Sequence, residues 1–234
     1  MATSSTPSDA DLLHRGEVTV KGRMPDSSNA TFLVELALDG ATGHAIYKPG
    51  RGERPLWDFP PALFRREVAA YLLSDALGWS LVPLTIEREG PFGAGSMQQF
   101  VPADFEQHYF TLRGEAAYHE RLKQICLFDL IANNADRKSG HCLLCEGAIY
   151  AIDNGLTFHV EPKLRTVIWD FAGQPIEPSL IADIRRVIAD PPTALTDLLT
   201  RDERRAFATR GRRLADHGAF PEDSTGLRYP WPLV

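Results

Sequence analysis

The stretch from residue 131 to residue 155, IANNADRKSGHCLLCEGAIYAIDNG, constrains the fold of this chain more than any other. Two apolar runs, at residues 142–145 and 148–152, flank a Glu-Gly turn, and this pattern predicts a β-hairpin. Asp136 lies in the polar loop before the hairpin, and Asp153 follows the hairpin directly. Because a hairpin brings its two ends together, we expect the loop of Asp136 to lie beside Asp153.

Two carboxylates placed in this way suit phosphoryl transfer. One of them, Asp136, can accept or orient the proton of an attacking hydroxyl, and Asp153 can hold a metal ion on the phosphates of a nucleotide. A second interpretation is equally open from these residues alone, because Asp commonly caps a turn or ends a strand without any chemical role.

The composition limits the remaining possibilities. The 234 residues are enough for one domain or for two small lobes, and 44% hydrophobic and 24% charged residues are typical of a globular protein. The net charge of −6 predicts no nucleic-acid partner. No run approaches the roughly 20 apolar residues of a membrane span, so we expect no stable membrane insertion. An N-terminus without an apolar core and an odd count of three cysteines favour a cytoplasmic location.

The N-terminal half is typical of an antiparallel sheet. Alternating polar and apolar residues predict three strands, at residues 17–21, 31–38 and 44–48, with a turn over residues 39–43. The loop between the first two strands holds Ser27, Ser28 and Asn29, whose hydroxyls and amides can bind phosphate oxygens, although in isolation they form only a polar turn. Lys48 ends the third strand, where a lysine can bind phosphates as a point charge, although most strand-end lysines have no such role.

A helix over residues 62–77 follows two prolines, which favour a helix start. Within this helix Glu67 can pair with Lys48 and fix its ammonium group, and Asp75 is a competing partner. Further strands are predicted at residues 81–86 and 95–101, and helices at residues 115–131, 178–189 and 193–217. The proline-rich residues 229–234 cannot form a helix, so we expect them to be docked or disordered.

Several motifs resemble one kinase superfamily. Asn-Ala-Asp-Arg, followed by Ala-Ile-Asp-Asn-Gly-Leu-Thr-Phe, resembles the catalytic and metal-binding loops of the phosphatidylinositol 3- and 4-kinases, above all the type II 4-kinases. The HipA-like kinases share Asn-x-Asp-Arg more distantly. Ser-Ser-x-x-x-Phe, Lys-Pro with Glu-x-Pro, Arg-Glu-Val-Ala-Ala-Tyr-Leu and Gly-Ser-x-Gln-x-Phe-Val are also similar to type II segments, and the likeness runs in order from about residue 16 to residue 173.

The resemblance implies an α+β, two-lobed protein-kinase-like fold. The N-lobe would be a small antiparallel sheet with one helix over residues 13–101, and the mainly helical C-lobe would comprise residues 102–234. Residues 1–12 would form a disordered tail.

The resemblance also implies a role for each candidate site residue. ATP phosphates would bind to the loop of Ser27, Ser28 and Asn29 and to Lys48, which Glu67 would hold, and adenine would bind to the backbone at Gln99, Phe100 and Val101. Asp136 would be the catalytic-loop aspartate, and Arg137 or Lys138 would stabilise charge on the transferring phosphoryl group. His141 and Asp153 would hold Mg²⁺ or Mn²⁺.

His141 departs from the family pattern, in which an asparagine is the second metal ligand. A histidine favours manganese over magnesium. The alternative is that His141 only hydrogen-bonds the loop and that Asp153 holds the metal with water.

We therefore expect a kinase that transfers the γ-phosphate of ATP to an unidentified hydroxyl acceptor. The cysteine-rich insertion of the type II lipid kinases is missing, so a lipid, a soluble phosphorylated metabolite and a protein are equally open as acceptors. Two alternatives also remain open. One is a pseudokinase or nucleotide-binding scaffold without turnover, and the other is an enzyme of the same fold that transfers AMP.

Overall fold

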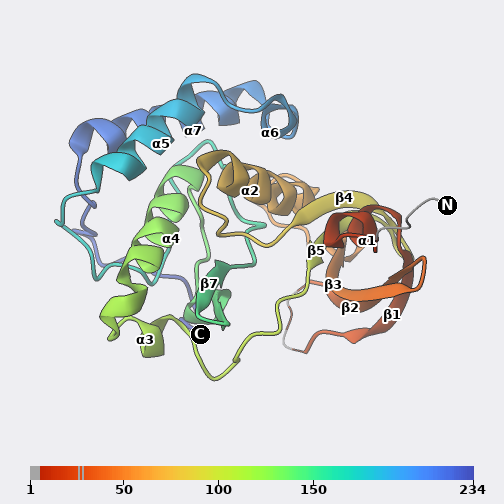
Figure 1. Cartoon of the computed structure of the whole chain (residues 1–234). Helices are drawn as coiled ribbons and strands as arrows, with labels where there is room; N and C mark the ends of the chain where they lie inside the picture. Colours follow the sequence, from red (N-terminus) through yellow and green to blue (C-terminus); the bar gives the residue numbers. More distant parts are fainter. Residues whose placement is uncertain (1–5, 26, 28) are drawn as a thin grey trace. The chain divides into compact units, whose positions relative to one another are not determined.

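The computed structural model describes residues 6–25, 27 and 29–234 (Figure 1). The chain divides into two compact units, of which the first contains the residues up to Val68 together with Pro83–Val101. The second unit contains Ala69–Val82 and Pro102–Val234. Helix α2 (Leu63–Leu77) begins in the first unit and ends in the second.

The first unit is built on a five-stranded antiparallel sheet with the strand order β1-β2-β3-β5-β4. Its strands are β1 (Glu17–Arg23), β2 (Phe32–Leu38), β3 (Ala41–Pro49), β4 (Thr85–Gly90) and β5 (Gly93–Gln99), and a short 3₁₀ helix η1 (Gly50–Gly52) follows β3. Alternate residues of β2 and β3 are buried, namely Val34, Leu36, Ala45 and Tyr47. These side chains form the core of this unit, as the alternating pattern predicts.

The turn between β2 and β3 is tighter than the predicted turn over residues 39–43. Asp39 and Gly40 have φ angles of 47° and 83°, which are the left-handed values of a two-residue hairpin turn. Residues 41 to 43 therefore pair with β2 and belong to strand β3.

A short helix precedes the sheet, where we expected the chain to be disordered up to residue 12. This helix, α1 (Asp9–Arg15), begins after Ser8, whose hydroxyl accepts a hydrogen bond from the backbone of the first turn. Leu12 and Leu13 are only 5% and 2% exposed and pack into the core of the sheet. Burial of these two leucines and the helix cap together explain why residues 9–12, which were expected to be disordered, belong to α1.

Strand β4 begins at Thr85, four residues later than predicted. Leu81 and Val82 do not pair in the sheet, because their N–H groups donate to the Ser74 hydroxyl at 2.7 and 3.1 Å. These two residues are buried in the core of the second unit.

The second unit is mainly helical (Figure 1). Its helices are α3 (Tyr109–Leu112), α4 (His119–Ala132), α5 (Pro178–Ala189), α6 (Thr193–Asp197) and α7 (Arg201–His217), with 3₁₀ helices η2 (Ala116–Tyr118) and η3 (Ser139–His141). Strands β6 (Cys142–Cys145) and β7 (Ala148–Ala151) form the hairpin that the sequence predicts. Helices α5 and α7 lie side by side, and α7 also contacts α4 (Figure 1).

The helix predicted over residues 193–217 is divided in two. Helix α6 ends at Asp197, and Thr200 begins α7 through a capping box with Glu203. Because the Thr200 hydroxyl accepts a hydrogen bond from the Glu203 backbone at 3.3 Å, a new helix starts at this position.

The predicted fold class is confirmed, because the structure combines a small antiparallel sheet with a mainly helical part. Among the described residues, no helix has both the length and the apolar character needed to cross a membrane.

Candidate active site

Lys48 and Glu67 form an ion pair in the first unit. Lys48 lies on β3 opposite Ser96 of β5, and Glu67 lies on α2 with 3% of its surface exposed. The close approach of the two strands requires a glycine next to this pair, because a Cβ atom at Gly95 would lie 2.4 Å from the Lys48 carbonyl oxygen. The ammonium group of Lys48 is thus held by a buried carboxylate.

The loop before β2 is held by its own polar side chains. The Ser27 hydroxyl donates to the Thr31 hydroxyl at 2.8 Å, and the Asn29 side-chain oxygen accepts from the Arg54 backbone at 2.8 Å. Asn29 therefore ties this loop to the segment that follows Lys48. Ser28, the third residue predicted to bind phosphate, lies outside the described residues.

The segment at the end of β5 was predicted to bind adenine through its backbone. The N–H groups of Gln99 and Phe100 donate to Leu84 and His44 at 2.8 and 3.1 Å, so the sheet already uses them. Within the described part of the chain, no hydrogen bond is formed by the N–H of Val101. Val101 is thus the member of the predicted trio whose backbone donor stays available to a ligand.

The loop of Asp136 follows α4 directly. Asn133 ends the helix with a left-handed φ of 57°, and the Asn134 side chain accepts from the Asp136 N–H at 2.9 Å. The Asp136 carboxylate accepts a hydrogen bond from the Lys138 ammonium group at 2.9 Å. Burial raises the pKa of Asp136 above its usual value, and the adjacent Lys138 partly opposes this shift. Asp136 therefore binds a proton more readily than an exposed aspartate does.

Arg137, which was predicted together with Lys138 to stabilise charge on a transferring phosphoryl group, lies inside the second unit. Its side chain is fully buried, and its guanidinium donates to both oxygens of Asp129 at 3.0 to 3.1 Å. The same guanidinium donates to the Ile152 carbonyl and to the Asn154 side chain, each at 2.6 Å. Arg137 therefore joins the loop of Asp136 to the loop of Asp153 and is a positioning residue.

Asp129, the partner of Arg137, was not among the predicted site residues. Asp129 lies on α4, is fully buried, and also accepts hydrogen bonds from Asn134 and Thr166 at 3.0 and 3.3 Å. The signal in the sequence is an aspartate within the otherwise apolar run Cys-Leu-Phe-Asp-Leu-Ile-Ala. A charged residue in such a run requires a buried partner, and the nearby Asn-Ala-Asp-Arg motif contains one.

The β6–β7 hairpin brings the two predicted metal ligands together. His141 Nε2 lies 3.4 Å from an Asp153 carboxylate oxygen, while His141 Nδ1 accepts from the Lys138 N–H at 3.3 Å. Two donor atoms at this separation can both bind one divalent ion at roughly 2.1 Å. Within the described residues, no cluster of three or more His, Cys, Asp and Glu side chains is suited to hold a metal. Nucleotide phosphates and water would therefore complete the coordination, as is usual for magnesium.

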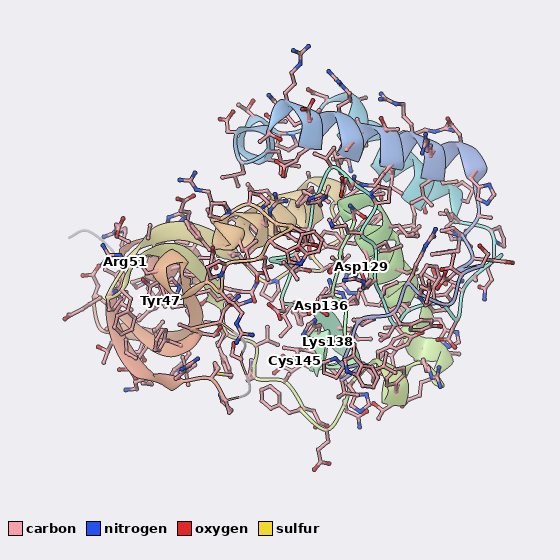
Figure 2. The ribbon with its side chains drawn as sticks, turned by 180° about the vertical axis from the view of Figure 1, so that it is seen from behind. Tyr47, Arg51, Asp129, Asp136, Lys138 and Cys145 are labelled. Carbon is pink, nitrogen blue, oxygen red and sulfur yellow. The ribbon has the colours of Figure 1, made fainter. Side chains whose placement is uncertain are left out.

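Figure 2 shows Asp136 and Lys138 close together, with Asp129 on α4 above them in this view. A further segment flanks this loop, because the Arg165 N–H donates to the Asn134 carbonyl at 2.9 Å and the Arg165 carbonyl accepts from the Arg137 N–H at 3.0 Å. The side chain of Arg165 is exposed. An exposed cation is therefore anchored through its backbone to both sides of Asp136.

The fold is similar to that of kinases of known structure. The Golgi casein kinase with Mn/ADP bound matches with a TM-score of 0.54 and 15% identity, over 96% of this chain and 80% of that chain. The Helicobacter pylori proinflammatory kinase CtkA matches with a TM-score of 0.52 and 11% identity, over 88% of this chain and 93% of that chain. The structure of hydra Fam20 with sugar matches with a TM-score of 0.50 and 12% identity, over 91% of this chain and 89% of that chain. The chain therefore has a kinase-like fold, and the closer likeness to phosphatidylinositol kinases stays a prediction.

No family model matches the sequence. Protein Rv2133c of Mycobacterium tuberculosis is 39% identical over 261 aligned positions, which cover 94% of this chain and 94% of that protein. The chain belongs to the same family as Rv2133c.

Proposed function

We propose that this protein is an ATP-dependent phosphotransferase that resembles the phosphatidylinositol 3- and 4-kinases. The observation that carries the proposal is the buried guanidinium of Arg137, which ties the loop of Asp136 to the loop of Asp153. A proton acceptor and a metal-binding carboxylate held together in this way are what phosphoryl transfer requires. The kinase-like fold supports the same reaction class.

Each side chain then has a definite role. Lys48, held by Glu67, binds phosphates of ATP, and the free N–H of Val101 binds adenine. Asp136 takes the proton of the acceptor hydroxyl while the new P–O bond forms and the bond to ADP breaks. Lys138 contacts Asp136 and places a positive charge near the transferring group.

His141 and Asp153 would hold Mg²⁺ or Mn²⁺, because their donor atoms lie 3.4 Å apart and face one another. A bound ion would neutralise charge on the phosphates. The His141 ring also supports a second candidate function. A protonated His141 would form an ion pair with Asp153 and occupy the metal-binding carboxylate, so that the protein would bind nucleotide without turning it over.

The surroundings of Asp136 indicate the chemical class of the acceptor. Arg165 places an exposed cation beside Asp136, which favours an acceptor with an anionic group. A phosphorylated soluble metabolite, a phosphoinositide head group and an acidic protein segment all carry such a group.

Phosphorus NMR of the protein with ATP and either metal tests the proposal. A kinase gives ADP and a phosphorylated acceptor or inorganic phosphate, an AMP-transferring enzyme gives pyrophosphate, and a pseudokinase gives no product. Asp136→Asn should remove most turnover while metal-dependent ATP binding persists, because only the proton acceptor is lost. Asp153→Asn should weaken that binding itself. Identical behaviour of the two variants would refute this division of roles.

A further inference from the structure

The C-terminal segment over residues 228–234 runs along the two backbone segments that flank Asp136. The Leu233 carbonyl accepts from the Ser139 N–H at 2.8 Å, and the Arg228 carbonyl accepts from the Thr166 N–H at 3.0 Å. In Figure 1 the end of the chain accordingly lies beside the hairpin that follows Ser139. Both contacts join main-chain atoms, so they depend on the path of the segment and not on the identity of its side chains.

The segment is anchored at some positions and exposed at others. Pro230 is buried, Leu233 packs against the core of the second unit, and the ring of Tyr229 lies 6.4 Å from that of Trp169. Trp231, by contrast, is 87% exposed. The segment is therefore docked through Tyr229, Pro230 and Leu233, so of the two expected states of the tail the structure shows the docked one.

The turn that leads into this segment is also fixed. The Asp223 carboxylate accepts from the Thr225 N–H and from the Arg228 N–H, each at 3.0 Å. Arg228 is therefore held on one side by Asp223 and on the other by Thr166. A segment fixed at both ends can act as a rigid support for the loop that it crosses.

The contact with Ser139 is placed where it affects both candidate catalytic groups. Ser139 is fully buried and begins the short helix η3, between Lys138, which binds Asp136, and His141, which faces Asp153. A buried N–H that loses its partner is unfavourable, so the turn would rearrange if the Leu233 carbonyl were removed. Such a rearrangement would move the side chains of Lys138 and His141.

We propose that residues 228–234 are a positioning element of the active site, which fixes the loop of Asp136 through the carbonyls of Arg228 and Leu233. The catalytic part of this inference rests on the proposed phosphotransferase function. The docking of the segment is independent of that function, and docking and catalysis can be measured separately.

The test compares the full chain with three variants. Deletion of Pro232–Val234 removes the Leu233 carbonyl, Leu233→Ser keeps the carbonyl but weakens its apolar anchor, and Trp231→Ser changes an exposed residue of the same segment as a matched control. Hydrogen exchange reports whether the Ser139 amide is protected, with the amides of α4 as an internal reference. Steady-state kinetics give kcat and the KM for ATP.

We expect faster exchange at residues 137–141 in the deletion and in Leu233→Ser, with exchange in α4 unchanged. We expect kcat to fall by about 10-fold or more because the proton acceptor is misplaced. The affinity for ATP without metal should stay within about 2-fold, since Lys48 and Val101 are untouched, and the KM for metal-bound ATP should rise because His141 moves with the turn. Trp231→Ser should match the parent in every measurement.

Unchanged exchange at Ser139, faster exchange throughout α4, or an unchanged kcat in the deletion would each overturn the positioning role. A parent protein that transfers no phosphoryl group would refute the proposed function, and the exchange measurement would then decide on the docking alone.

Discussion

Replacing Arg137 by methionine should both destabilise the protein and inactivate it. The substitution leaves the carboxylate of Asp129 buried without its charged partner, because both groups are fully buried. Removing one partner of a buried ion pair costs about 3–5 kcal/mol of the free energy of unfolding. For a chain of this size that corresponds to a melting temperature lower by roughly 10 °C. The two loops that Arg137 ties would also separate, and a displacement of about 1 Å costs on the order of 100-fold in kcat.

Two comparison variants isolate the physical cause. Arg205→Met removes an exposed arginine that lies 3.8 Å from Asp202 on the surface of α7, and it should change stability by less than about 1 kcal/mol. The double variant Asp129→Asn/Arg137→Met removes both buried charges together. It should regain roughly 2 kcal/mol relative to Arg137→Met, because no unpaired charge stays buried.

The double variant should not regain activity, because the bonds from Arg137 to Ile152 and Asn154 are still missing. Thermal unfolding followed by circular dichroism, together with kcat for ATP turnover, provides both readouts. A loss below about 1 kcal/mol in Arg137→Met would contradict the buried-pair reasoning. A double variant with the kcat of the parent would show that Arg137 does not hold the loops.

Three more substitutions probe the site. Lys138→Met removes the hydrogen-bond donor whose charge lowers the pKa of Asp136, so this pKa should rise further. Because only the unprotonated carboxylate accepts a proton, the acid limb of the kcat–pH profile should move to higher pH. If His141 binds the metal, the parent should be more active with manganese than with magnesium, and His141→Asn should raise the ratio of the magnesium-supported rate to the manganese-supported rate. An unchanged ratio would show that His141 only hydrogen-bonds the loop. Arg165→Ala should raise the KM for an anionic acceptor by about 10-fold without changing the KM for ATP. Arg204→Ala, which also removes an exposed arginine, is the control. An equal change of the acceptor KM in both variants would show that Arg165 does not bind the acceptor.

The hairpin that organises the site was predictable because its signals are local. The Glu146-Gly147 turn adopts left-handed φ angles of 49° and 81°, and the apolar runs on either side pair in register from Cys142 with Ala151 to Cys145 with Ala148. The number of residues on each side of the turn thus determines which residues meet at the open end of the hairpin. The contact between His141 and Asp153 follows from that geometry.

The role of Arg137 was not predictable from its residue type. Arginine is among the residues that are almost never fully buried, so an exposed, catalytic position was the natural expectation. Its burial depends on Asp129, which lies eight residues earlier on a helix whose other neighbours are apolar. Docking of the segment around Leu233 likewise depends on main-chain contacts between distant residues, which leave no pattern in the sequence.

In both loops of the site a buried polar residue directly follows the candidate functional aspartate. Asp136 is followed by the buried Arg137, and Asp153, which has a left-handed φ of 56°, is followed by the buried Asn154. The two buried neighbours bind each other, since the Arg137 guanidinium donates to the Asn154 side-chain oxygen at 2.6 Å. Because Arg137 is also fixed to Asp129 on α4, the helix sets the position of both loops at once. The separation of the two carboxylates is therefore determined by buried groups.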